Sequence, residues 1–210
     1  MVSVGRSAVA GTRRRPPMVN TFLVPPVSFL DWVADGIRLV GVVSFVVVCI
    51  GWGGVFAAML ALALLGLVTP RFLGLRPCVD IATGIAVLIA AWCSVLDLYR
   101  TYPSIDIPIH LVLDGLLALL AVVAAARGGV LQDRRTPVLF LTTLTVGLAL
   151  GALWEMGEWV GNRLDEAVLV GYDDSILDMT VGGLGAGLAG LLVPAALRRG
   201  RWQGRDDSAL

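Results

Sequence analysis

Lysine is absent from this 210-residue sequence, and charged residues of all kinds make up only 15% of it. A soluble domain carries about a quarter charged residues, so the composition argues against a soluble globular protein. The three cysteines have neither zinc-site spacing nor the even number of a disulfide framework. No phosphate-binding loop, nucleophile elbow, HExxH zinc motif or nucleic-acid-binding module occurs. The sequence therefore offers no signature of a nucleotide-binding or nucleic-acid-binding protein.

What the chain has instead is apolar residues, which account for 57% of it, with a mean hydropathy of +0.85. Residues 37–69 form an apolar run of 33 residues. As one helix this run would be about 50 Å long, whereas a hydrocarbon core is about 30 Å thick. Gly51, Gly53 and Gly54 interrupt it, which predicts two short helices joined by a tight turn.

Four further apolar segments follow, at residues 79–96, 108–126, 138–159 and 176–197. The expected fold is therefore all-α, a polytopic membrane bundle of six transmembrane helices. One transmembrane domain would cover residues 37–197. Residues 1–36 would form a mostly disordered cytoplasmic tail, in which Asp31 and Asp35 argue against a signal segment. Residues 198–210 would form a second cytoplasmic tail.

Arginine placement predicts the orientation of these six helices. With six spans, both tails and the loops at 70–77 and 127–136 share one side, and that side holds 14 arginines against two, Arg100 and Arg163. If residues 37–69 were a single helix, the split would fall to 9 against 7. Because cytoplasmic loops are enriched in arginine and lysine, the count favours six spans with both termini cytoplasmic. The expected location is the plasma (inner) membrane, with the lipid bilayer as the partner.

Acidic residues gather on the opposite, outward side, together with the only histidine. They lie in stripes spaced by four residues, which places the members of each stripe on one helix face. The stripes are Asp106, His110, Asp114 and Ala118; then Gly147, Gly151 and Glu155, with Glu158 one turn on; then Asp174, Asp178, Gly182, Ala186 and Gly190. Small residues spaced in this way let membrane helices approach closely. The acidic groups are therefore expected to face neighbouring helices.

So many carboxylates in one place require either protonation or a counter-charge, and a divalent cation would supply that charge. Oxygen ligands with one imidazole suit Mg²⁺, Ca²⁺, Mn²⁺, Zn²⁺ or Fe²⁺. The candidate ligands are His110, Asp114, Glu155, Glu158, Asp174 and Asp178, and further site candidates are Asp106, Asp173, Trp154 and Trp159.

Several of these residues also have a structural interpretation. Asp106 and Asp174 could cap the helices that follow them, and Glu158 could be solvated at a helix end. Trp154 and Trp159 could anchor the bundle at the membrane interface. The stripes of small residues are typical of helix packing.

Three segments carry a family resemblance: D-I-P-I-H at 106–110, W-E-M-G-E-W at 154–159 and D-S-I-L-D-M at 174–179. In this order they resemble the YjdF-like family of small bacterial inner-membrane proteins, over about residues 60–195. The chain departs from the family pattern at Ile107, where an arginine is usual, and at Val160, where a second aromatic is usual. The resemblance implies a polytopic membrane protein and brings no activity with it.

Three functions remain open from the sequence. The first is a cation centre, either binding only or serving a membrane enzyme that acts on lipid-linked substrates or small molecules. The second is proton or cation transport, for which Asp80 is the one acidic residue placed to continue a polar path on the inner side. The third is a structural or partner-binding protein. The sequence leaves the reaction, the metal and the oligomeric state undetermined.

Overall fold

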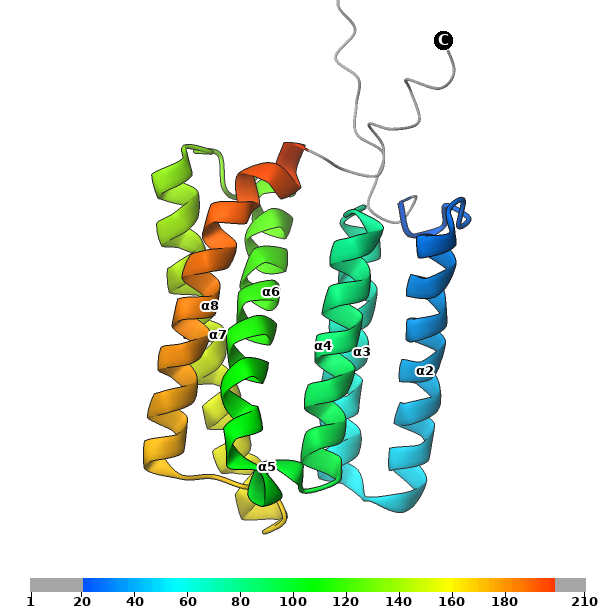
Figure 1. The fold of residues 1–210 in the computed structure, drawn as a ribbon, viewed down its shortest axis with the longest axis vertical. Coiled ribbons are helices and arrows are strands. Elements are labelled where there is room, and N and C mark those ends of the chain that lie inside the picture. Colours follow the sequence, from blue (N-terminus) through cyan, green and yellow to red (C-terminus); the bar gives the residue numbers. More distant parts are fainter. Residues whose placement is uncertain (1–20, 199–210) are drawn as a thin grey trace, which may run out of the picture.

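The computed structural model describes residues 21–198, and every regular element in that range is helical (Figure 1). Two short elements, α5 (Leu98–Thr101) and the 3-10 turn η1 (Pro103–Ile105), connect α4 to α6. The six long helices are α2 (Phe29–Gly51), α3 (Gly54–Phe72), α4 (Pro77–Val95), α6 (Asp106–Arg127), α7 (Thr136–Leu164) and α8 (Tyr172–Arg198). All six are long and apolar enough to cross a membrane. The all-α class and the six predicted spans are confirmed; most of the two predicted tails lies outside the described residues.

The helices form two units of three, α2–α4 and α6–α8, joined through the contact of α4 with α6 (Figure 1). The units run in opposite directions. Helix α6 starts at the end of the bundle where α5 lies, called here the α5 end, whereas α2 starts at the opposite end (Figure 1). The first and third helices of the two units therefore begin at opposite ends of the bundle.

The predicted break in the first apolar run lies where the glycines are. Helix α2 ends at Gly51 and α3 begins at Gly54. Between them Gly53 adopts a φ of 89°, in the left-handed region that residues with a side chain rarely occupy. The two-helix interpretation of residues 37–69 is confirmed.

The predicted start of the first helix at residue 37 is wrong by about two turns. Helix α2 begins at Phe29, because Ser28 and Asp31 form a capping box in which each side chain accepts a hydrogen bond from the other's backbone N–H. Asp35 lies inside the helix and pairs with Arg38 and Arg71. The two aspartates that suggested a tail therefore belong to a membrane-length helix.

Helix ends near the acidic residues also differ from expectation. Helix α7 continues to Leu164, so Glu158 is not at a helix end, and α8 already begins at Tyr172. Asp106 is the first residue of α6, while Ile105 occupies the N-cap position without a side-chain cap. Asp174 likewise lies inside the first turn of α8. Neither aspartate occupies the N-cap position, which corrects that interpretation.

Small residues let α6, α7 and α8 pack at very short range. A Cβ atom on Gly185 would lie 1.9 Å from the backbone oxygen of Leu111, and one on Gly147 would lie 2.2 Å from the Cβ of Ala186. Only glycine fits at such crossings. The packing interpretation of the small-residue stripes is confirmed, and it draws the polar faces of the three helices together.

Apolar cores and polar groups alternate between the two units. At the α5 end, α2–α4 bury an apolar cluster that includes Val48, Phe56, Leu60 and Ala91. At the opposite end, α6–α8 bury another that includes Leu119, Val123, Leu139 and Val193. Buried ionisable groups occupy the complementary places, Asp114, Glu155 and Asp178 at the α5 end of α6–α8 and Asp80 at the far end of α2–α4.

Candidate metal centre

The first three turns of α6 hold a carboxylate–imidazole–carboxylate row. Asp106, His110 and Asp114 are spaced by four residues and so share one helix face. The Nε2 atom of His110 lies 3.3 Å from Oδ1 of Asp106, and its Nδ1 atom lies 3.2 Å from Oδ2 of Asp114. Both ring nitrogens of the only histidine therefore face carboxylates of its own helix.

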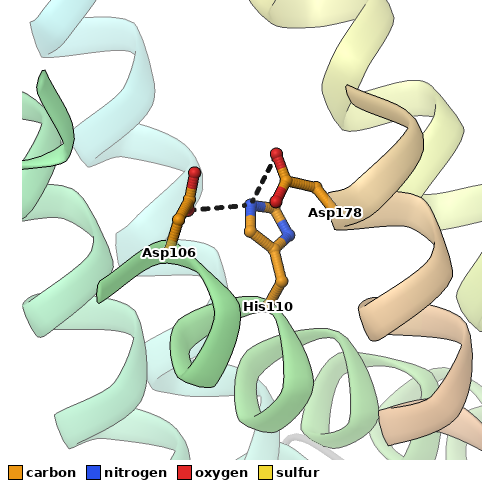
Figure 2. Close-up of side chains that lie close together, drawn as sticks. All are labelled: Asp106, His110 and Asp178. Carbon is orange, nitrogen blue, oxygen red and sulfur yellow. Dashed lines mark ion pairs between the residues drawn. The ribbon is translucent and has the colours of Figure 1, made fainter. Parts of the chain in front are cut away.

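A third carboxylate reaches the same imidazole from α8. Oδ2 of Asp178 lies 3.9 Å from Nε2 of His110, on the ring edge that also faces Asp106 (Figure 2). One ligand atom from each of Asp106, His110 and Asp178 lies within 4.8 Å of the other two. These three residues are called here the three-residue centre.

Asp178 is the most deeply buried residue of this group. It is 3% exposed, and its Oδ1 atom has no hydrogen-bond partner among the described residues. A buried carboxylate oxygen without a donor costs free energy on the order of 1–3 kcal/mol or more. Such an orphaned acceptor beside an imidazole and a second carboxylate fits a site that takes a positively charged ligand.

Asp114 occupies a place that the glycine of a neighbouring helix leaves free. A Cβ on Gly182 of α8 would lie only 2.0 Å from Oδ2 of Asp114, and one on Gly151 of α7 would lie 3.9 Å from the same atom. The carboxylate is therefore held between three helices, in contact with Nδ1 of His110. This is the position of a group that orients an imidazole.

Two carboxylates of α7 lie at the edge of the cluster. Glu155 is 9% exposed, and Glu158 accepts a hydrogen bond of 2.9 Å from Nε1 of Trp154. Both lie close enough to His110 and Asp106 to interact electrostatically with them, and Asp174 of α8 does so as well. These three predicted ligands are not part of the three-residue centre.

The remaining site candidates lie away from the centre. Asp173 is exposed in the first turn of α8 and forms no hydrogen bond or ion pair with the described part of the chain. Trp159 is half exposed, and the guanidinium of Arg163 lies 5.0 Å from the centre of its ring. Trp154 donates its indole N–H to Glu158 and is not part of the three-residue centre.

Two polar features of the structure were not predicted from the sequence. Tyr99 in α5 donates a hydrogen bond to the backbone oxygen of Ala90 at 3.3 Å. Burial, and then the negative charge of Asp106, raise the pKa of Tyr99 above its ordinary value. In the sequence, the only indication of Tyr99 was its place in a polar, aromatic segment between two apolar runs. At the far end of the bundle, Arg38 of α2 pairs with Asp80 of α4 across 42 residues of chain.

The geometry around His110 matches a recurring arrangement of metal sites. A proton on Nδ1 would be donated to Asp114, which leaves the Nε2 lone pair facing Asp106 and Asp178. A histidine that binds a metal usually donates its other ring N–H to a carboxylate in this way. The donor set of two carboxylates and one imidazole suits Mn²⁺, Fe²⁺ or Zn²⁺, and with added water also Mg²⁺.

Six membrane-length helices and a buried carboxylate–histidine cluster define a polytopic membrane protein with a polar centre near one end of its bundle. Residues 36–199 match the model of the family described as "Predicted membrane protein (DUF2238)". The chain belongs to that family, and the match covers all six long helices except the first turns of α2. No curated protein and no solved structure matches the chain.

Proposed function

We propose that the protein binds a divalent cation through Asp106, His110 and Asp178, with Asp114 positioning the imidazole. The observation that carries this proposal is the orphaned Oδ1 atom of the buried Asp178, whose other oxygen, Oδ2, lies 3.9 Å from Nε2 of His110. Three protein ligands leave coordination positions for water or substrate, as in catalytic metal sites.

Charge supports the same proposal. The carboxylates of Asp106, Asp114 and Asp178 surround one imidazole, so even a protonated His110 leaves a net negative charge if all three are ionised. Burying uncompensated carboxylates costs several kcal/mol each, and a divalent cation removes that cost. The acidic residues outside the centre, Glu155, Glu158 and Asp174, would complete its outer shell or act on a molecule bound there.

The arginine distribution supports a proposed orientation of the bundle. The loops and helix ends at the end opposite α5, with both tails, hold 14 arginines against two. We infer that this end is cytoplasmic and that the cation centre opens to the other face of a plasma (inner) membrane.

Metal analysis and calorimetry on the purified protein test the proposal. The wild-type protein is expected to bind one equivalent of a divalent cation, and Asp178→Asn to weaken that binding at least tenfold. Asp173→Asn is the matched control, because it makes the same chemical change in the same helix at an exposed residue. If all three proteins bind no divalent cation, or all bind it equally, the proposal is wrong.

A spare carboxylate beside the centre favours an enzyme over a purely structural site. Glu155 and Glu158 interact electrostatically with His110 and Asp106, and a carboxylate outside the ligand set is what a metal-assisted hydrolase uses as a base. Lipid-linked substrates could enter such a site laterally from the bilayer. Loss of turnover in Glu155→Gln with metal binding retained would support this role.

Proton or cation transport receives less support. The inner-side residue on which it depended, Asp80, is bound by the guanidinium of Arg38. A relay through Asp80 would have to break this buried pair in every cycle. Uptake by the protein in liposomes, lost in both Asp80→Asn and Asp178→Asn, would reverse this judgement.

A further inference from the structure

A small pocket lies beside the cluster at the α5 end, where the two three-helix units meet. Its apolar wall comes from α3 and from the connection between α7 and α8, and includes Phe56, Met59 and Leu169. Its polar wall includes Asp97, Tyr99 and Glu158. The pocket thus joins an apolar surface to a polar one, which is the division found in ligand sites for amphiphilic molecules.

The polar wall carries two carboxyl groups and no cationic side chain. None of the residues that line the pocket is an arginine or histidine. Asp97 pairs with Arg100 at 3.3 Å, but both side chains are more than half exposed, so solvent screens the pair. Glu158 forms no ion pair within the described residues; Trp154 donates its one hydrogen bond. An anionic ligand would be repelled here, whereas a cationic one would compensate Glu158.

We propose that this pocket binds the ammonium group of an amphiphile, with Glu158 as its counter-ion and the apolar wall against the first part of its chain. Tyr99 also lines the pocket, and ammonium groups are attracted to aromatic rings. An alkyl chain fits the apolar wall and distinguishes the ligand from a small free amine, which would gain only the charge interaction.

The pocket and the cation centre share the same surroundings. Glu158 lines the pocket and interacts electrostatically with His110 and Asp106 of the centre. The suggestion that the amphiphile is a substrate rests on the proposed cation centre. The binding of the amphiphile in the pocket does not depend on that centre. An aminolipid headgroup would place its ammonium at Glu158 and a neighbouring oxygen group toward the centre.

Calorimetry on metal-free protein in a neutral detergent tests the binding, with n-hexylammonium as the probe. Hexanol and hexanoate of equal chain length test the charge, and methylammonium tests the chain. Hexylammonium is expected to bind at least tenfold more tightly than any of the three. Equal binding of hexanol or hexanoate would overturn the proposal, and equal binding of methylammonium would show that the pocket takes small free amines and not amphiphiles.

Three variants locate the site. Glu158→Gln is expected to weaken hexylammonium binding at least tenfold, and Leu169→Trp, which fills the pocket from an exposed loop residue, to do the same with Glu158 intact. Asp173→Asn should bind as the wild type does. If both pocket variants retain binding, the proposal is wrong. If the protein binds the amine but no metal, the pocket proposal stands and the cation-centre proposal is wrong. If it binds the metal but no amine, the cation-centre proposal stands and the pocket proposal is wrong.

Discussion

At the scale of single residues, the carboxylates around His110 differ in what they can do. Asp106 and Asp178 face Nε2, whereas Asp114 faces Nδ1 and lies in the space above Gly182. A metal bound at Nε2 is out of reach of the carboxylate on Nδ1, because the two nitrogens point to opposite edges of the ring. Asp114, predicted as a ligand, is therefore better placed to orient the ring.

Replacing Asp114 by asparagine should weaken cation binding by about 10–100-fold, the usual cost of losing the partner that orients a metal-binding histidine. Calorimetry measures the change, and it should be smaller than that caused by Asp178→Asn in the same titration. Binding as tight as in the wild type would place Asp114 outside the site, and complete loss would make it a ligand.

At the scale of helices, the site depends on how closely α6 and α8 approach. Gly185→Ala would place a Cβ 1.9 Å from the backbone oxygen of Leu111, and backbone cannot move aside as a side chain can. Overpacking of this kind costs about 1–3 kcal/mol or more. Thermal unfolding in detergent should show the loss, together with weaker cation binding as the helices separate.

Gly157→Ala on α7 is the control for that substitution. Nothing lies within 4 Å of its added Cβ, and alanine is favoured over glycine in a helix by about 0.5–1 kcal/mol. The variant should therefore be as stable as the wild type or slightly more stable. A loss of stability equal to that of Gly185→Ala would mean that close approach is not the cause.

The ion pair at the end of α2–α4 opposite α5 gives a prediction that does not depend on the cation centre. Arg38 and Asp80 form a buried pair, with side chains 12% and 3% exposed. Asp80→Asn should lower the free energy of unfolding by about 1–3 kcal/mol, because Arg38 loses its more deeply buried counter-ion and keeps the 30% exposed Asp35. Cation binding at the α5 end should be unchanged in the folded fraction. A large fall in cation affinity would instead mean that the Arg38–Asp80 pair and the three-residue centre are energetically coupled.

At the scale of the whole molecule, both ends of the described chain lie at the same end of the bundle, because the number of long helices is even (Figure 1). The two units each bury an apolar cluster at one end and polar groups at the other, in opposite senses. The two polar groups are thus placed near opposite membrane surfaces, where charge is less costly than at the midplane.

Labelling with a membrane-impermeant maleimide tests the proposed orientation. In a background without the three native cysteines, Arg100→Cys in α5 should be labelled in sealed, right-side-out membrane vesicles. Asp133→Cys, between α6 and α7, should be labelled only after permeabilisation, since both sites are exposed but lie at opposite ends. The reverse labelling pattern would mean that the bundle has the opposite orientation in the membrane, with the proposed cation centre at the cytoplasmic face.

The sequence alone determined the number of spans, because crossing a bilayer needs about 20 apolar residues and the runs and their breaks are local features. It also determined the row Asp106, His110 and Asp114, since a spacing of four residues in a helix leaves no choice of face. For the same reason it indicated that Asp178 and Gly182 share a face of α8.

Only the tertiary structure decided which of these groups meet. Whether Asp178 or Asp174 approaches Nε2 depends on the height at which α8 packs on α6, and that height is set by contacts such as Gly185 against Leu111. The pairing of Arg38 with Asp80 joins residues 42 apart, and no local pattern specifies it. Helix faces follow from chain periodicity, but the depth at which two helices dock depends on the shapes of both surfaces together.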